Sequence, residues 1–422
     1  MRQARGAKTW LPLLGLMAFG FASSAAAQPS SQIGFKFGEG RLHPFLDIDS
    51  RFDSAVGFFN RDASGNPIPS PELVFGFRGG ARYDLTNQST NVAFKGEAEY
   101  LFFSGALSPS SRSLSRFQAN VGVETAFNKD GAVEVQLGDN FLRSDRTQNP
   151  VIGVGVLSLF NEVHVAAPIH PGGRALEVTP RVGWAVEFFD PLLTGAVGGC
   201  QTGDITCNPA TLGQMNYSNL NFALTGRYKF LPKTAVIVDT GLDYRTYFSG
   251  GTANRPATVF RAQAGLNGLI SPRISLALMA GVTHDFGPSN STAPSGTLQV
   301  SYIPTDLTTI SLGYTRSIQP TPVFGVFADD RGYLNAKVGF MDGRLSLNAD
   351  ASVDYFSFYG TGGGTSGRND FLVSGRLGPS FSVTPWFMVG AGYGLSFRTS
   401  TASVSTVNYT RHEAFLRLTL HY

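Results

Sequence analysis

The chain ends in AFLRLTLHY, residues 414–422, where apolar even positions alternate with mostly polar odd positions. The apolar positions are Ala414, Leu416, Leu418, Leu420 and Tyr422. Successive side chains of a β-strand point to opposite faces, so this stretch predicts a strand with one apolar face. In water such a terminal strand would be an adhesive edge, whereas in a closed barrel its apolar face meets lipid. The last strand of a soluble β-sandwich is the alternative.

The same alternation recurs through the rest of the chain. Between residues 92 and 103 the even positions are mostly apolar, whereas Lys95, Glu97 and Glu99 occupy odd positions. The segment 345–355 alternates in the same way, and neither segment fits the 3.6-residue period of a helix. The pattern predicts about 18 strands, with 16 as the alternative, and most are as long as a membrane-crossing strand. The predicted spans are 43–58, 72–84, 91–103, 114–127, 132–143, 152–167, 174–190, 217–230, 235–248, 257–269, 274–286, 295–303, 308–318, 331–341, 344–357, 369–380, 386–398 and 408–422.

The connections between these strands alternate in length. One set is short and contains Pro, Gly, Asn or Asp, as in 128–131 and 341–344. The other set is mostly longer and rich in Ser, Thr, Gly and Asn, and it includes 191–216 and 319–330. Outer-membrane barrels have short periplasmic turns and longer extracellular loops. We therefore predict an all-β fold, a closed antiparallel transmembrane barrel in a Gram-negative outer membrane with both termini in the periplasm.

The amino terminus has the features of an export signal. Arg2, Arg5 and Lys8 precede an apolar run from Trp10 to Phe21, which is too short to span a bilayer. An A-x-A cleavage pattern follows, so residues 1–27 are predicted to be a signal peptide. Residues 28–42 are then either a periplasmic segment or the start of the first strand, and residues 43–422 form the barrel.

Composition agrees with an exported barrel. Charged residues make up 15% of the chain, against roughly 25% in ordinary globular proteins. Removal of the signal leaves 30 basic and 30 acidic residues, so the mature chain is neutral and offers no basic stripe for nucleic acid. The strand count predicts an aqueous channel, because barrels of 16–18 strands are too wide for side chains to fill.

We call the odd or even position of a residue along its strand its parity. Because side chains alternate between the two faces of a strand, parity assigns each residue to the lipid or to the lumen face. The terminal strand places Leu416, Leu418, Leu420 and Tyr422 towards lipid, where the assembly machinery would read them as an insertion signal. Three glycines on one parity of 386–398 are expected to leave open space towards the lumen. The residues predicted to face the lumen are Asp47, Asp49, Arg51, Arg78, Arg82, Lys95, Glu97, Glu99, Arg116, Glu124, Arg227, Asp239, Asp243, Arg245, Arg261, Arg376, Gly390, Gly392 and Gly394. Both signs of charge are mixed, which predicts ion pairs along the wall rather than a selective ring of one sign.

The two cysteines, Cys200 and Cys207, lie in the longest predicted loop. In an oxidising compartment they are expected to form a local disulfide. A metal site is the alternative, although no His or third Cys lies near them in the sequence.

Arrangements of catalytic or ligand-binding residues are not recognisable in the sequence. None of the six His residues lies near a Ser and an acidic residue in a nucleophile motif. The Gly-rich stretch 360–364 falls in a predicted loop and not between a strand and a helix, which argues against phosphate binding. We therefore predict no catalytic residue, no cofactor and no metal, with a barrel-embedded enzyme or a surface-structural barrel as alternatives.

Two short stretches resemble a known family. The residues Leu137-Gly138-Asp139-Asn140-Phe141-Leu142-Arg143-Ser144-Asp145, and Arg41 to Leu46, are similar to the β-barrel porin type-2 group. Some members of that group, in myxobacteria, are linked to exopolysaccharide export. The resemblance implies a conduit for a secreted polysaccharide that works with a separate periplasmic export protein. Its expected partners are outer-membrane lipid, the barrel-assembly machinery and the polysaccharide, and a small-solute diffusion porin is the alternative function.

Overall fold

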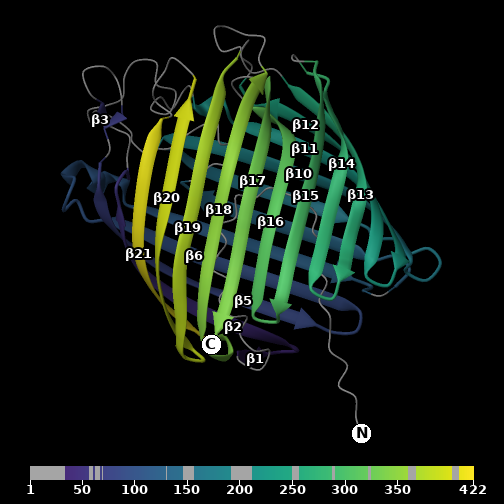
Figure 1. The fold of residues 1–422 in the computed structure, drawn as a ribbon, viewed down its shortest axis with the longest axis horizontal. Helices are drawn as coiled ribbons and strands as arrows, with labels where there is room; N and C mark the ends of the chain where they lie inside the picture. The colour runs from purple at the N-terminus through teal and green to yellow at the C-terminus, as the bar shows by residue number, and fades with distance from the viewer. Residues whose placement is uncertain are drawn as a thin grey trace.

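The computed structural model describes residues 34–56, 60–61, 67–68, 70–129, 131–145, 156–191, 212–249, 256–287, 290–321, 325–359, 367–401 and 408–422. Eighteen long antiparallel strands form one closed barrel (Figure 1). The predicted fold class and strand number are therefore confirmed. No helix in the described segments is long and apolar enough to cross a membrane.

The strands follow one another around the wall in chain order. They are β2 (Gly40–Asp53), β5 (Glu72–Thr86), β6 (Thr90–Phe103), β7 (Arg116–Phe127), β8 (Val135–Ser144), β9 (Val156–Ala166), β10 (Leu176–Pro191), β11 (Tyr217–Leu231), β12 (Thr234–Tyr247), β13 (Ala257–Ser271), β14 (Ile274–Asp285), β15 (Thr292–Thr305), β16 (Thr308–Thr321), β17 (Gly325–Phe340), β18 (Leu345–Tyr359), β19 (Asn369–Thr384), β20 (Phe387–Ser400) and β21 (Tyr409–His421). A short β1 (Phe35–Phe37) extends the sheet beside β2, and β3 (Asn60–Arg61) pairs with β4 (Pro67–Ile68) outside it. Two short 3-10 helices, η1 (Pro109–Leu114) and η2 (Met341–Gly343), lie in connections.

The barrel closes where the last strand meets the first. In the β2–β21 ladder Ile48 is opposite Leu418 and Asp49 is opposite Arg417. The backbone N–H of Tyr422 donates to the carbonyl of Pro44 at 3.0 Å, so the ladder continues to the final residue. Among the strands that the structure describes, closure leaves no long unpaired edge, which is the condition for crossing a bilayer with strands.

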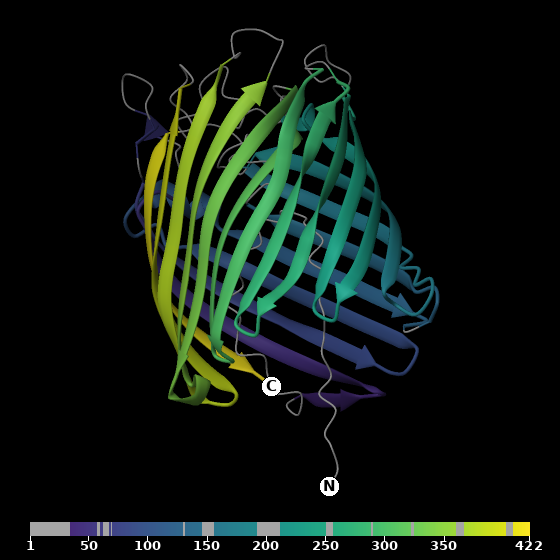
Figure 2. The same ribbon diagram turned by 45° about the vertical axis from the view of Figure 1, so that its right-hand side comes forward.

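The two ends of the barrel differ in their connections (Figure 2). We call the end with short connections the turn end; it also holds β1 and the carboxyl terminus. The opposite end is the loop end. The predicted turns are confirmed, for example between β11 and β12 and between β13 and β14. The predicted loop 319–330 is wrong, because β16 runs to Thr321 and β17 begins at Gly325.

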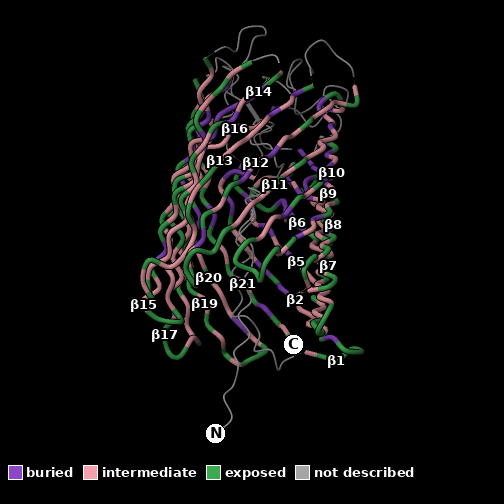
Figure 3. Tube along the Cα trace, turned by 90° about the vertical axis from the view of Figure 1, so that its right-hand side faces the viewer, coloured by how far each residue is buried: buried purple, intermediate pink, exposed green. Residues whose placement is uncertain are grey.

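Exposed residues alternate with less exposed ones along the strands of the wall (Figure 3). Side chains that pack into four buried apolar clusters come from the loop-end parts of the strands and from the segments that join them. The rest of the inner wall is mostly polar, with single apolar side chains such as Phe415 and Met388 between the polar ones. The apolar packing of this barrel therefore lies at one end and not along its axis.

Several sequence-based predictions concern residues outside the described ranges. These are the signal peptide 1–27, residues 28–33 of the following segment, and both cysteines. The predicted boundary at residue 43 falls within β2, which begins at Gly40.

Candidate functional site

The two faces of the wall are chemically different. Asp47 is 4% exposed, whereas its neighbours Leu46 and Ile48 are 42% and 38% exposed. Tyr333 on β17 donates its hydroxyl to Gln299 on β15 at 2.8 Å, across the intervening strand. Side chains of non-adjacent strands can meet in this way only on the concave face, so Tyr333 and the residues of its parity line the lumen.

The predicted charged residues of the wall are brought together mostly as pairs. The pairs are Asp47 with Arg78, Arg82 with Asp84 (2.7 Å), Lys95 with Glu97 (3.0 Å), Arg116 with Asp145, Glu124 with His164 (3.5 Å), Asp239 with Arg261 (2.9 Å) and Arg376 with Glu413 (3.5 Å). Asp243 accepts from Asn221 at 2.8 Å, and Asp49 is opposite Arg417 in the ladder. Three further predicted residues lie on the same face, each two positions along its strand from a polar residue of the same parity. They are Arg51 beside Asp53, Glu99 beside Glu97, and Arg227 beside Thr225. Opposite charges alternate around the wall, so its surface is polar without one dominant sign.

The three glycines of β20 do not share one environment. A Cβ at Gly390 would meet nothing closer than 3.7 Å, and Gly390 borders a small pocket. The Phe415 ring covers Gly392, where a Cβ would meet the ring at 2.4 Å, and Glu413 approaches the Cβ position of Gly394 at 3.4 Å. The expected open space is therefore absent at Gly392, because the ring of its cross-strand partner fills it.

That ring also holds two guanidinium groups on the inner wall. Arg376 lies 4.9 Å and Arg417 lies 5.8 Å from the centre of Phe415. The pocket beside Gly390 is lined by Asn348, Asp350, Arg376, Ser380, Phe415 and Arg417 among others. Arginine stacking on an aromatic ring stabilises by roughly 0.5–2 kcal/mol, so these positively charged side chains are held against the wall.

At the loop end, the segment 104–115 between β6 and β7 folds against the inner face. Leu114 packs on Val74, Leu101 and Phe103, all at lumen parity. Glu72, which is fully buried, accepts hydrogen bonds from Ser104 Oγ at 2.7 Å, from Ser108 N at 3.2 Å and from Ser111 Oγ. One carboxylate therefore fixes the segment to the mouth of the barrel.

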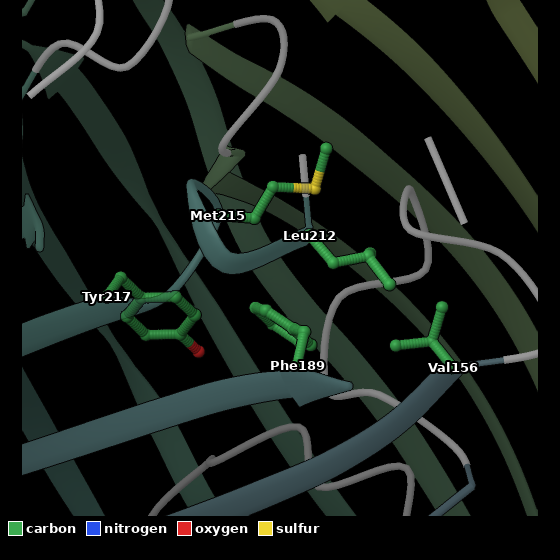
Figure 4. Packing of buried hydrophobic residues seen from close by; sticks show 5 residues of the cluster. All are labelled: Val156, Phe189, Leu212, Met215 and Tyr217. Carbon is green, nitrogen blue, oxygen red and sulfur yellow. The ribbon is translucent and has the colours of Figure 1, made fainter. Parts of the chain in front are cut away.

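Residues 212–216, which precede β11, fold inwards beside it (Figure 4). Leu212 and Met215 pack on Val156 of β9 and Phe189 of β10. The backbone N–H of Phe189 donates to Asn216 Oδ1 at 2.8 Å, which anchors the turn. Of the predicted loop 191–216, the structure describes Pro191, which ends β10, and residues 212–216.

The third inward element is the β16–β17 hairpin tip, which we define as residues 317–321 and 325–328. Ile318, Val326 and Ala328 have outward parity, yet they are buried against Val259, which has inward parity on β13. An outward side chain can reach the inner side of another strand only if its own strand bends into the lumen. The tip therefore leaves the wall and lies over the inner face of β13.

A chain of polar contacts holds the tip from the other side. Ser158 Oγ and Tyr217 OH both donate to the fully buried Glu187, at 2.5 and 2.6 Å. The Arg245 guanidinium stacks on Tyr217 at 3.9 Å and donates to the carbonyl of Pro320 at 2.9 Å. Arg245 on β12 and Pro320 on β16 are four strand spacings apart, about 19 Å along the wall, so this bond spans the lumen side of three strands.

The alternation along residues 235–248 predicts that Arg245 faces the lumen, but it does not identify the partners of Arg245. Glu72, Tyr217 and Pro320 were not among the candidate residues, because their roles depend on contacts between distant segments. One signal was present in the sequence. The predicted loop 319–330 contains Val323-Phe324-Gly325-Val326-Phe327-Ala328, which is more apolar than the other long connections and suits a segment that packs inside.

The chemistry of the interior is that of a lined passage. Within the described residues, no group of three or more His, Cys, Asp or Glu side chains is placed to hold a metal ion. The middle of the barrel offers paired charges and hydroxyls, and the loop end offers apolar clusters and three inward segments. Such a wall is chemically suited to hydrated polar solutes.

The comparison with family models agrees with the barrel architecture. The family described as "TonB dependent receptor-like, beta-barrel" matches residues 178–415. No curated protein matches the chain in sequence. Among solved structures, OccAB3 of Acinetobacter baumannii is 11% identical, with a TM-score of 0.47 over 92% of this chain and 100% of that one. OccK9 (OpdG) of Pseudomonas aeruginosa is 13% identical, with a TM-score of 0.47 over the same shares. The siderophore receptor PirA of Pseudomonas aeruginosa is 8% identical, with a TM-score of 0.44 over 90% of this chain and 80% of that one.

Proposed function

The chain belongs to the TonB dependent receptor-like β-barrel family, and we propose that this outer-membrane barrel is a channel through which small hydrophilic solutes diffuse. In this proposal the turn end faces the periplasm and the loop end faces the exterior, as in other outer-membrane barrels. Solutes pass along the paired charges of the inner wall. The hairpin tip sets the largest size that enters.

The observation that carries the proposal is the inward position of this tip. The Arg245–Pro320 hydrogen bond and the packing of Ile318 on Val259 hold it over the lumen. Two further segments, 104–115 and 212–216, fold inwards from other parts of the rim. A passage narrowed from three sides suits small solutes better than a bulky hydrated polymer.

Export of a secreted polysaccharide, implied by the resemblance to the porin type-2 group, is the alternative function. It requires a continuous opening wide enough for the polymer and a periplasmic export protein at the turn end. The mixed charges of the wall suit weak contact with a passing polymer, since tight binding would stall transit. The two functions differ in the direction and the size of the cargo.

Liposome swelling tests the proposal directly. The purified barrel, reconstituted in liposomes, should admit monosaccharides quickly and larger oligosaccharides slowly. A variant in which residues 318–328 are replaced by an Asn-Gly turn should admit the larger sugars faster, because the tip no longer narrows the mouth. Heat-modifiable mobility on gels checks that both proteins are folded.

Two results would count against small-solute diffusion. One is a folded wild-type barrel that admits no monosaccharide. The other is a deletion strain that loses a surface polysaccharide while its uptake of small nutrients stays normal, which would support the export function instead.

A further inference from the structure

The outer face of β5 to β9 differs from the lipid-facing wall expected for a barrel that stands alone. Asp139 lies near the middle of β8, at the same parity as the exposed Val135 and Leu137. Its inward neighbour Gly138 lies against His164 and Glu124 of the inner wall. Asp139 therefore points outwards, at a depth where hydrocarbon surrounds a monomeric barrel.

Among the described residues, the hydrogen-bond partner of Asp139 on this face is neutral. Asn161 of β9 donates its amide to Asp139 Oδ1 at 2.8 Å. Arg143, four residues further along β8, also points outwards. Its guanidinium group lies 5.9 Å from the centre of the Phe117 ring. Ionisable groups that face lipid are costly, and a carboxyl group beside a carboxamide has no counter-charge. The wall thus presents one acidic and one basic group that do not pair with each other.

Small residues border these charged groups. Gly79, Ala98 and Ala119 are successive cross-strand partners on β5, β6 and β7, and the row ends at Arg143. Ala81 and Gly96 form the start of the next row. A parallel row of large, exposed rings, Phe77, Tyr100 and Phe117, flanks the first row. We call the two rows the small-residue strip; small side chains of this kind let another backbone approach closely within a membrane.

We propose that the outer face of β5–β9 is a contact surface between two copies of this chain. The small-residue strip supplies close packing, and Asp139 of one copy pairs with Arg143 of the other. In a contact with two-fold symmetry both copies use the same surface. A face that carries one acidic and one basic group can therefore form two equivalent ion pairs, each between Asp139 of one copy and Arg143 of the other. Asp139 and Arg143 are four positions apart, which is about 13 Å along the strand, and strand tilt and the long arginine side chain reduce the difference in depth.

Another charged pair on the outer face shows why β8 requires a partner. Arg316 and Asp330 also have outward parity, but they form an ion pair in which Arg316 Nη1 donates to both carboxylate oxygens of Asp330 at 3.1 Å. That pair is complete within one chain, near the loop ends of β16 and β17. It shows that charged side chains on the outer wall can pair within one chain, which Asp139 and Arg143 do not do within the described part of the chain.

The test measures the mass of the folded barrel in membranes. In cells that express Ala98→Cys, oxidation should produce a product of twice the chain mass. Ala264→Cys, on the outward parity of β13, should give at least tenfold less of this cross-linked product. The wild-type chain, oxidised in the same way, shows how much product its native cysteines form. Absence of this difference would overturn the proposal, as would a product whose mass fits another protein.

Charge exchange distinguishes pairing from simple exposure. Asp139→Arg and Arg143→Asp should each reduce the cross-linked product at least tenfold, and the double variant should restore it. Asp139→Leu gives a second, independent result. If Asp139 only faces lipid, this change leaves the mass of the purified particle unchanged and raises its thermal stability. If Asp139 pairs with a second copy, the change halves that mass, because the dimer dissociates into folded monomers.

Discussion

The turn end and the loop end of the barrel are made from the same strands, yet their connections have different tasks. At the turn end, Pro232 and Lys233 alone separate β11 from β12, and they only reverse the chain. At the loop end, the segment 104–115 and the hairpin tip carry buried apolar side chains and return into the lumen. A connection at the turn end adds little to the wall, whereas these segments at the loop end define the mouth.

This difference separates two sources of stability. The wall is held by its closed ladder and by the sorting of side chains between lipid and water. The mouth is held by local clusters and by a few buried acceptors such as Glu72 and Glu187. Substitutions in the wall should therefore affect assembly, and substitutions at the mouth should affect the passage of solutes.

The largest effect is expected from a charge on the lipid-facing side of the closing strand. Leu418→Arg should prevent insertion, because an arginine facing the middle of a bilayer costs about 2–4 kcal/mol. Asn348→Arg introduces the same side chain at lumen parity and should leave assembly intact. Heat-modifiable mobility of both variants in outer-membrane fractions provides the measurement. Equal assembly of the two would mean that the faces are assigned wrongly.

Strand parity predicted the wall because the alternation is local. The segment 345–355 identifies β18 without knowledge of its neighbours, and every predicted strand matches an observed one. The mouth could not be predicted in the same way. Ile318 and Val326 have outward parity, so their burial depends on Val259, some sixty residues earlier in the chain. The cover over Gly392 likewise depends on Phe415 of the next strand, and composition does not indicate it.

The next largest effect concerns the hairpin tip. Arg245→Ala removes both the stacking on Tyr217 and the hydrogen bond to Pro320. Together these contacts are worth about 1–3 kcal/mol, so the fraction of barrels in which the tip leaves its inward position should rise about 5-fold to 150-fold. Single-channel conductance in planar bilayers should rise or fluctuate more. Arg227→Ala changes the same residue type on β11 near the turn end and should leave conductance close to wild type.

A more local effect, without a change in conductance of the kind expected for the hairpin tip, is expected for the segment 104–115. Glu72→Gln keeps the shape of the side chain but removes the charge that accepts from Ser104, Ser108 and Ser111. The loss should be roughly 1–3 kcal/mol and confined to this segment, because buried acceptors of this kind act locally. Hydrogen exchange at 104–115 should become faster while the strands stay protected. Glu124→Gln, at a largely exposed side chain, should change exchange in neither place.

The last prediction concerns the difference in unfolding stability between substitutions at two nearby glycines of β20, Gly390 and Gly392. Gly392→Ala places a methyl group where the Phe415 ring lies, 2.4 Å away, so the ring and the two arginines stacked on it must shift. Overpacking of this kind costs about 1–3 kcal/mol. Gly390→Ala meets only ordinary contacts at 3.7 Å and should change stability by no more than about 0.5 kcal/mol. Urea unfolding of the two variants in lipid vesicles measures the difference. Equal midpoints would show that Phe415 moves aside without cost, and then both glycines would be open to larger side chains that narrow the lumen.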